Sequence, residues 1–354
     1  MTLFLVICFV TELPQQTDEG HSTKILNYQT FFHENPRVLL LTYWRSGSTF
    51  LGEMLSYYPD TFYRFEPFMY LNLLGHVDSS QALEAVQVLK HLLLCDYTNA
   101  PQYFQLVKKE EWNSDTLLKL KNQSSPCHAY PKSLCAFRRN TWDCLRNPTE
   151  LCLKTGLLEN ACRNARLLII KTVRLRLRHA IELLKDKKVP NLHVIHLVRD
   201  PRGLIASRKQ KRWCITPDCR DPRFLCRSLQ DDLLIGDIIQ YRYGVKYLRV
   251  RYEDVAMQPK TWSEKLLRFL NFPMHEEINK YVNLHTRKGN NHTFFDNKGR
   301  LQYPLTYRES IKTAREWTKK LTYSELQTIQ NVCQLVIQKL GYRMIKRKGV
   351  LAIL

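Results

Sequence analysis

The sequence predicts an α/β fold in which a central, largely parallel sheet is covered by helices on both faces. The chain has 354 residues, of which 44% are hydrophobic, enough for a substantial core. Short apolar runs of strand length alternate with stretches of helical spacing, and this alternation is typical of parallel sheets. The apolar runs lie at 38–43, 167–171, 192–198 and 247–251.

The first half of the chain begins with a strand at 38–43, because a continuous apolar run indicates a strand buried on both faces. It ends in Trp44-Arg45-Ser46-Gly47-Ser48-Thr49, and apolar residues then recur at helical spacing over 50–59. A short strand is expected at 62–65 and a helix at 83–94. The stretch 99–148 contains four prolines and three cysteines and has little periodicity. It predicts an irregular, disulfide-bonded insertion.

The second half continues the alternation. After the strand at 167–171, residues 173–178 alternate like a strand, whereas Leu177, Ile181 and Leu184 fit a helix, and we favour the helix. Asp200 and Pro201 follow the next strand and suit the N-cap and first turn of a helix. That helix is expected to reach about Arg212. The later elements are expected at 225–241 (helix), 247–251 (strand, closed by Tyr252-Glu253-Asp254), 262–270 (helix) and 323–340 (helix).

We expect three regions along the chain: an N-terminal segment at 1–35, one domain at 36–342 and a basic tail at 343–354. Met1–Val10 is almost entirely apolar but is shorter than the roughly 20 residues that span a bilayer. It reads either as part of an incomplete membrane anchor or signal, or as a buried strand. The eleven cysteines include no C-x-x-C pair, which argues against a zinc or iron–sulfur site.

The composition also indicates compartment and partners. Ten cysteines beyond Cys8, with the glycosylation sequons at Asn122 and Asn291, favour an oxidising lumen. The formal net charge of +21 favours polyanionic partners. It does not choose among nucleic acid, anionic glycan and a phosphorylated small molecule. Because no nucleic-acid-binding motif accompanies the charge, a nucleic-acid binder is the weakest of these readings.

Two strand–helix junctions carry the strongest chemical signal. At the first, Arg45 to Phe50 follow a buried strand and open a helix, a geometry that binds anions through backbone N–H groups and the helix dipole. The loop lacks the lysine of a Walker A motif, which argues against an NTPase. At the second, Arg199 and Ser207 bracket the start of another helix. Since ligands of open α/β sheets bind at the carboxyl ends of strands, the two junctions suggest one ligand with anionic groups at both ends. Asp200 and Arg202 can instead form a structural ion pair.

The sequence resembles the Golgi carbohydrate sulfotransferases over 36–342. YWRSGSTFLGEML is similar to their 5′-phosphosulfate loop and HLVRDPRGLIASR to their 3′-phosphate motif, while FYRFEPF, RYEDVA and CQLVIQKLGY follow the family order. The subgroup that sulfates the 6-hydroxyl of galactose, N-acetylgalactosamine or N-acetylglucosamine, as in keratan and chondroitin sulfate, is the most similar. The resemblance implies a P-loop-like three-layer sandwich and the donor 3′-phosphoadenosine 5′-phosphosulfate (PAPS), released as PAP, with no metal.

The resemblance assigns roles to individual residues. Arg45, Ser46, Gly47, Ser48, Thr49 and Phe50 are expected to hold the 5′-phosphosulfate, and Arg199 and Ser207 the 3′-phosphate. Arg45 is also expected to stabilise the transferring group. Glu66 is the expected base, although a structural salt bridge to Arg64 or another arginine is the alternative. Lys171 and Arg174 are candidate acceptor contacts. His196 and Trp317 are more simply explained as core residues.

The resemblance further implies a glycan or proteoglycan acceptor, a type II Golgi membrane protein with a lumenal domain, and no nucleic-acid partner. It leaves open whether the protein forms a homodimer. Two alternatives remain: a non-catalytic binder of anionic glycans on the same scaffold, and a sulfotransferase with another acceptor.

Overall fold

The computed structural model describes residues 35–68, 71, 75–104, 154–286, 294–295, 301–302 and 309–346. The predicted N-terminal segment, most of the 99–148 insertion and both sequon asparagines, Asn122 and Asn291, lie outside these residues.

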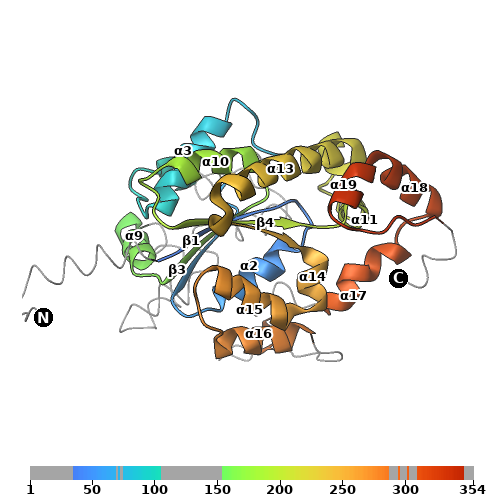
Figure 1. Ribbon diagram of the computed structural model, residues 1–354. Helices are drawn as coiled ribbons and strands as arrows, with labels where there is room; N and C mark the ends of the chain where they lie inside the picture. The colour runs from blue at the N-terminus through green and yellow to red at the C-terminus, as the bar shows by residue number, and fades with distance from the viewer. Residues whose placement is uncertain are drawn as a thin grey trace, which may run out of the picture.

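A five-stranded parallel sheet forms the centre of the molecule (Figure 1). Its strands run in the spatial order β2-β3-β1-β4-β5. They are β1 (Arg37–Leu41), β2 (Thr61–Phe65), β3 (Leu167–Thr172), β4 (Leu192–Val198) and β5 (Tyr247–Arg251). Every residue of β1, β3 and β4 is buried, as continuous apolar runs require. The predicted α/β fold with a largely parallel sheet is therefore confirmed.

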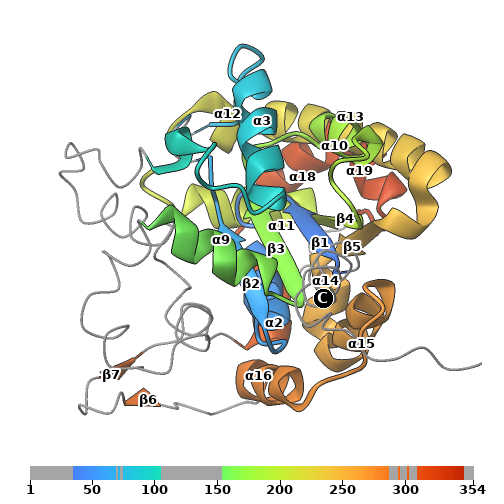
Figure 2. The same cartoon turned by 90° about the vertical axis from the view of Figure 1, so that its left-hand side faces the viewer.

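Helices cover both faces of the sheet and make it the middle of three layers (Figures 1 and 2). Leu39 and Leu41 of β1 join the core on one side, while Val38 and Leu40 join the core on the other. The first face is covered by α3 (Ala82–Leu93), α9 (Thr155–Arg163), α10 (Ala180–Lys185) and α13 (Pro222–Tyr243). The second is covered by α2 (Ser48–Ser56), α14 (Tyr252–Met257), α15 (Pro259–Phe269) and α16 (Glu276–Thr286).

A third group of helices packs around α11 (Pro201–Lys209) at one end of the sheet. It contains α18 (Tyr323–Val332) and α19 (Gln334–Lys339), with the four-residue α12 (Pro217–Arg220) preceding α13. The short α17 (Ser310–Arg315) packs instead against α14 on the second face of the sheet. The remaining elements are short. They are β6 (Phe294–Phe295), β7 (Leu301–Gln302) and the 3-10 turns η1 (Pro101–Phe104), η2 (Leu177–His179), η3 (Gly244–Lys246) and η4 (Glu316–Lys319).

Several predicted boundaries agree with the structure and several do not. The Asp200 side chain accepts a hydrogen bond from the Arg202 backbone N–H, so the predicted N-cap is confirmed. The helix favoured through Leu177, Ile181 and Leu184 is confirmed, with η2 starting at Leu177 and α10 at Ala180. The helix expected at 323–340 is two helices separated at Cys333, and α11 ends at Lys209 instead of Arg212. Tyr252-Glu253-Asp254 opens α14 directly rather than closing a strand.

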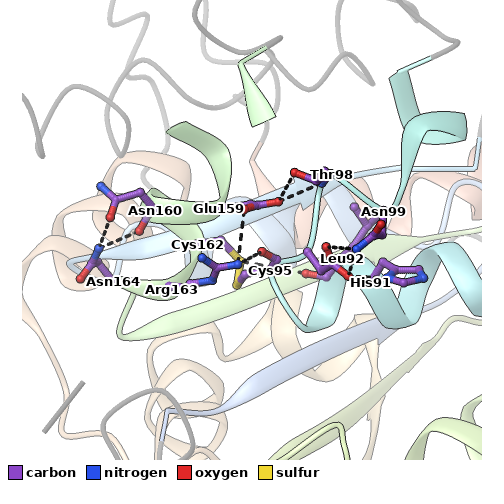
Figure 3. A network of polar contacts seen from close by, with 11 residues as sticks. His91, Leu92, Cys95, Thr98, Asn99, Glu159, Asn160, Cys162, Arg163 and Asn164 are labelled. Carbon is purple, nitrogen blue, oxygen red and sulfur yellow. Dashed lines mark hydrogen bonds and ion pairs between the residues drawn. A yellow bond between two sulfur atoms is a disulfide. The ribbon is translucent and has the colours of Figure 1, made fainter. Parts of the chain in front are cut away.

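Three disulfides link described residues, which agrees with the predicted disulfide-bonded character. Cys95–Cys162 joins the end of α3 to α9, where Glu159 also accepts two hydrogen bonds from Thr98 (Figure 3). Cys214–Cys219 closes a short loop after α11, and Cys226–Cys333 joins α13 to the segment between α18 and α19. In the ranges that the structure describes, no helix combines the length and apolar character needed to cross a membrane.

Candidate active site

The loop after β1 has a backbone shape that few residues can adopt. Arg45 and Gly47 have positive φ angles of 71° and 86°. A Cβ at Gly47 would lie 2.1 Å from the Tyr252 ring, so this position requires glycine for both conformation and space. The Ser46 N–H donates to the Tyr43 carbonyl at 3.1 Å and closes the turn. The loop is therefore a tight and fixed bend.

This bend delivers the chain to the N-terminus of α2. Gly47 is the N-cap and provides no side-chain cap, and the first N–H groups of a helix have no partner within the helix. They point out of the helix end, where its dipole adds partial positive charge. The Ser48 side chain is buried and Thr49 is half-buried at the same end. An anion is the ligand that this combination favours.

Arg199, at the carboxyl end of β4, reaches across to the same loop. It is 5% exposed, and its Nη1 donates to the Arg45 carbonyl at 2.7 Å. Its Nη2 donates to the Thr313 carbonyl at 3.3 Å, and its guanidinium lies over the Tyr252 ring at 4.5 Å. Its Nε makes no hydrogen bond and is 3.9 Å from the nearest Glu253 oxygen. Buried positive charge therefore stands directly behind the first loop.

The two predicted anion-binding junctions meet in the structure. The Arg45 Nε donates to the Ser207 Oγ of α11 at 3.0 Å, in addition to the Arg199 contact with the same residue. The meeting follows from topology, because β1 and β4 are neighbours and both end at this edge of the sheet. Residues 162 positions apart thus line one site. A doubly anionic ligand can be held by both junctions at once.

Glu66 occupies the other side of the same sheet edge. It follows β2 with a positive φ of 50° and is 3% exposed. One carboxylate oxygen accepts a hydrogen bond from the Lys171 Nζ. The other accepts from the Arg174 Nη1 at 2.6 Å and from the Val173 N–H at 3.3 Å. The predicted alternative of a salt bridge to an arginine is thus present, with Arg174 as the partner, joined by Lys171.

Burial shapes the electrostatics of this cluster. Removal from water lowers the pKa of the Lys171 ammonium, and attraction to Glu66 opposes that effect. The pKa of the Arg174 guanidinium is lowered for the same reason and with the same opposition. The Lys171 Nζ also lies 4.0 Å from the centre of the Phe65 ring. The three charged groups therefore depend on one another to remain buried.

The residues that the sequence suggested to be structural are buried and contact other protein groups. Asp200 and Arg202 form a buried ion pair at 2.7 Å, and the Arg202 guanidinium lies over Trp317 at 4.8 Å. His196 is buried, and burial followed by repulsion from nearby arginines lowers its pKa to about 3. Its Nδ1 is hydrogen-bonded to the Tyr247 hydroxyl at 2.9 Å. His196 is therefore a neutral core residue.

Sequence reasoning did not single out Arg208, and it identified Tyr252 only as part of the RYEDVA motif, with a structural role expected. The Tyr252 ring packs against both Gly47 and Arg199, and Arg208 donates from Nε to the Trp44 carbonyl at 3.1 Å. Arg208 is 1% exposed, although its sequence neighbourhood is strongly basic and typical of a solvated surface. For Tyr252, its place at the end of a predicted strand was the available signal.

The described residues contain no group of three or more His, Cys, Asp or Glu side chains placed to hold a metal ion. The model for the sulfotransferase domain family matches residues 35–342, which is most of the chain. The chain belongs to the sulfotransferase family. Its α/β fold, with a five-stranded parallel sheet covered by helices on both faces, is the sulfotransferase fold.

Curated relatives are similar to this chain over most of their length. Carbohydrate sulfotransferase 1 of Mus musculus is 28% identical, and the match covers 94% of this chain and 86% of the mouse protein. Carbohydrate sulfotransferase 5 of Mus musculus is 27% identical, over 88% of this chain and 81% of that protein. Among solved structures, the sulfotransferase domain from the curacin biosynthetic pathway matches with a TM-score of 0.45 and 17% identity. That match covers 88% of this chain and 99% of the domain.

Proposed function

We propose that this sulfotransferase transfers sulfate from PAPS to the 6-hydroxyl of a galactose, N-acetylgalactosamine or N-acetylglucosamine residue in a glycan. The observation that carries the donor assignment is the contact of Arg45 with both Ser207 and Arg199, which joins the two anion-binding junctions. The glycan acceptor is supported by the similarity to carbohydrate sulfotransferases. The motifs resembling the 6-O-sulfating subgroup support the position that is sulfated.

The residues at the two junctions fit a donor with phosphate groups at both ends. In this proposal the amides at the start of α2 and the Arg45 side chain hold the 5′-phosphosulfate. Arg199 and Ser207 hold the 3′-phosphate. Bound PAPS supplies the sulfuryl group and the nucleotide that leaves. Because the bend at Gly47 is fixed, the backbone N–H groups at the start of α2 are aligned before the ligand binds. Such preorganisation of hydrogen-bond donors is the main source of electrostatic catalysis.

Glu66 is the proposed base for the acceptor hydroxyl. A carboxylate offers about four lone-pair sites, and Lys171, Arg174 and the Val173 N–H occupy three of them. The remaining site is on the oxygen that contacts Lys171. An acceptor O–H donating there would lose its proton to Glu66 as the oxygen attacks sulfur. Lys171 would then offset the charge that remains on the reacting oxygens.

We also propose that the enzyme works in the Golgi lumen as a type II membrane protein. The three disulfides among the described residues support an oxidising compartment. The sequons at Asn122 and Asn291 support passage through the secretory pathway.

A transfer assay tests the proposal. Purified protein is incubated with ³⁵S-labelled PAPS and desulfated chondroitin, desulfated keratan or N-acetylglucosamine-terminated oligosaccharides. Label is expected at carbon 6 of the accepted sugar, located by disaccharide analysis. Label on a tyrosine peptide, but on no glycan, would support the alternative of a different acceptor. Tight glycan binding without any transfer would support the non-catalytic alternative.

A further inference from the structure

A short disulfide-closed loop lies beside the proposed active site and has no role in it so far. Cys214 and Cys219 close this loop between α11 and α13. Both cysteines are buried, and their disulfide packs against Trp44 and Val173. Trp44 immediately precedes Arg45, and Val173 follows the last residue of β3. We refer to residues 212–220 as the cystine loop.

The position of the cystine loop relative to the two halves of the site is defined by contacts. Donor-binding residues lie at the ends of β1 and β4, whereas Glu66 and Lys171 lie at β2 and β3. The cystine loop touches the ends of β1 and β3. It therefore lies beside both the phosphosulfate loop and the end of β3, the strand that carries Lys171.

A continuous series of contacts connects the proposed base to the cystine loop. Glu66 pairs with Arg174, whose guanidinium lies 5.8 Å from the Trp44 ring. The Trp44 ring meets the Trp213 ring edge-on, with centroids 6.0 Å apart. Trp213 is half-buried, so part of its surface is open to solvent. Arg174 and Trp44 are only 4% and 7% exposed, so this series of contacts runs beneath the surface and reaches solvent at Trp213.

The cystine loop is held rigidly in place. Arg208 donates from Nε to the Trp44 carbonyl at 3.1 Å and from Nη1 to the Cys219 carbonyl at 3.3 Å. The same buried guanidinium thus anchors the phosphosulfate loop and the cystine loop. Arg220 donates back to the Cys214 carbonyl within the loop. A surface fixed in this way loses little conformational freedom when it binds a ligand.

The outward side of the cystine loop combines apolar and basic chemistry. Ile215 is 66% exposed and stands two residues from Trp213. Arg212 and Arg220 are both exposed, and Asp218 is the one acidic side chain of the loop. A pyranose ring presents C–H groups on one face and hydroxyls at its edge, so aromatic and aliphatic side chains bind the face. Arginines bind carboxylate or sulfate groups on neighbouring sugars.

We propose that the cystine loop forms the acceptor-binding wall of the enzyme and takes an anionic glycan. Trp213 and Ile215 pack against a sugar next to the one being sulfated, and Arg212 contacts an acidic group on the chain. This inference rests on the proposed function, because it assumes that Glu66 receives the acceptor hydroxyl. It adds the residues that select the glycan.

Binding of a chondroitin hexasaccharide in the presence of PAP tests the acceptor-binding wall. The Trp213→Ala variant is expected to weaken binding of the hexasaccharide about tenfold, as removal of a central aromatic contact does. Arg212→Ala is expected to weaken it about threefold, with the difference disappearing at high salt. PAP binding, measured by calorimetry, is expected to stay unchanged in both.

Matched controls come from the far end of α13. Tyr241 is 91% exposed and Arg242 is also exposed, and both lie about 28 Å along the helix from its first residue. Tyr241→Ala and Arg242→Ala are expected to bind the hexasaccharide like the wild type. Because Arg212 is exposed, Arg212→Ala tests the proposal even where Trp213→Ala fails to fold.

The outcomes separate this inference from the proposed function. Hexasaccharide binding that is unchanged in both Trp213→Ala and Arg212→Ala, or absent in the wild type, overturns the acceptor-binding wall. If binding depends on Trp213 but no sulfate is transferred to any glycan, the acceptor-binding role of the cystine loop is supported and the proposed catalytic function is contradicted.

Discussion

The charged groups are paired differently in the two halves of the site, the loop after β1 with Arg199 and the cluster around Glu66. On the donor side, Arg199 donates to two backbone carbonyls, and its ion pair with Glu253 is long, at 3.9 Å. On the other side, Glu66 is tightly paired with both Lys171 and Arg174. The first arrangement leaves positive charge for an incoming polyanion to neutralise. In the second, one carboxylate is buried between two cations, so most of the charge is paired internally and a single net positive charge remains.

This contrast predicts that loss of Glu66 damages chemistry and spares donor binding. Glu66→Gln keeps the size and part of the hydrogen bonding but removes the proton acceptor. We expect the transfer rate to fall about a thousandfold, a typical contribution of general base catalysis. The dissociation constant for PAP is expected to change less than threefold. Normal turnover in this variant would show that the internal ion cluster is only structural.

Arg45 and Arg199 are expected to show the reverse pattern. A charge-assisted contact with a phosphate contributes about 2 kcal/mol, so Arg45→Ala and Arg199→Ala should each weaken PAP binding about thirtyfold. Calorimetry with PAP measures this directly. Arg242→Ala, which removes an exposed arginine on α13, is the control and should bind PAP normally. Tight PAP binding by both site variants would mean that the nucleotide lies elsewhere.

A smaller effect is expected from the backbone of the donor loop. Gly47→Ala places a methyl group 2.1 Å from the Tyr252 ring. It also forces alanine, which disfavours positive φ angles, to adopt one at this position. We expect the free energy of unfolding to fall by about 2 kcal/mol and PAP binding to weaken. Gly156→Ala is the matched control, because a Cβ at that position meets no atom within 4 Å. Equal stability of the two variants would contradict the fixed-bend interpretation.

The last expected effect is a dependence of stability on pH. Burial holds the pKa of His196 at about 3, against 6.5 in the unfolded chain, so only the unfolded chain takes up this proton between those values. Stability should therefore fall as the pH drops from 6.5 towards 3, by about 1 kcal/mol per pH unit from this residue. In His196→Gln, the free energy of unfolding measured with urea should depend less steeply on pH between 6.5 and 3. Burial also lowers the pKa of His76 to about 3, so His76 should account for part of the pH dependence of stability that remains in this variant.

Sequence reasoning found the donor side more completely than the acceptor side, for a physical reason. Arg45 and Arg199 follow continuous apolar strands, and the rule that parallel strands share a carboxyl edge brings such residues together. The pairing of Glu66 with Lys171 depends instead on β2 lying next to β3, a neighbour relation that periodicity does not encode. The burial of Arg208 could not be predicted from the sequence either, because basic stretches usually face solvent. Predicted strands were accurate because burial on both faces leaves a strong pattern.

The C-terminal segment gives the enzyme an order of assembly. The guanidinium of Arg202 reaches Gln330 and the Arg343 carbonyl, while the Cys226–Cys333 disulfide joins parts of the chain 107 residues apart. A ribosome must therefore deliver almost the entire domain before the helix behind Arg199 is secured. Truncation within the last helices would remove the contacts that hold α11, the helix that carries Ser207, against the rest of the domain.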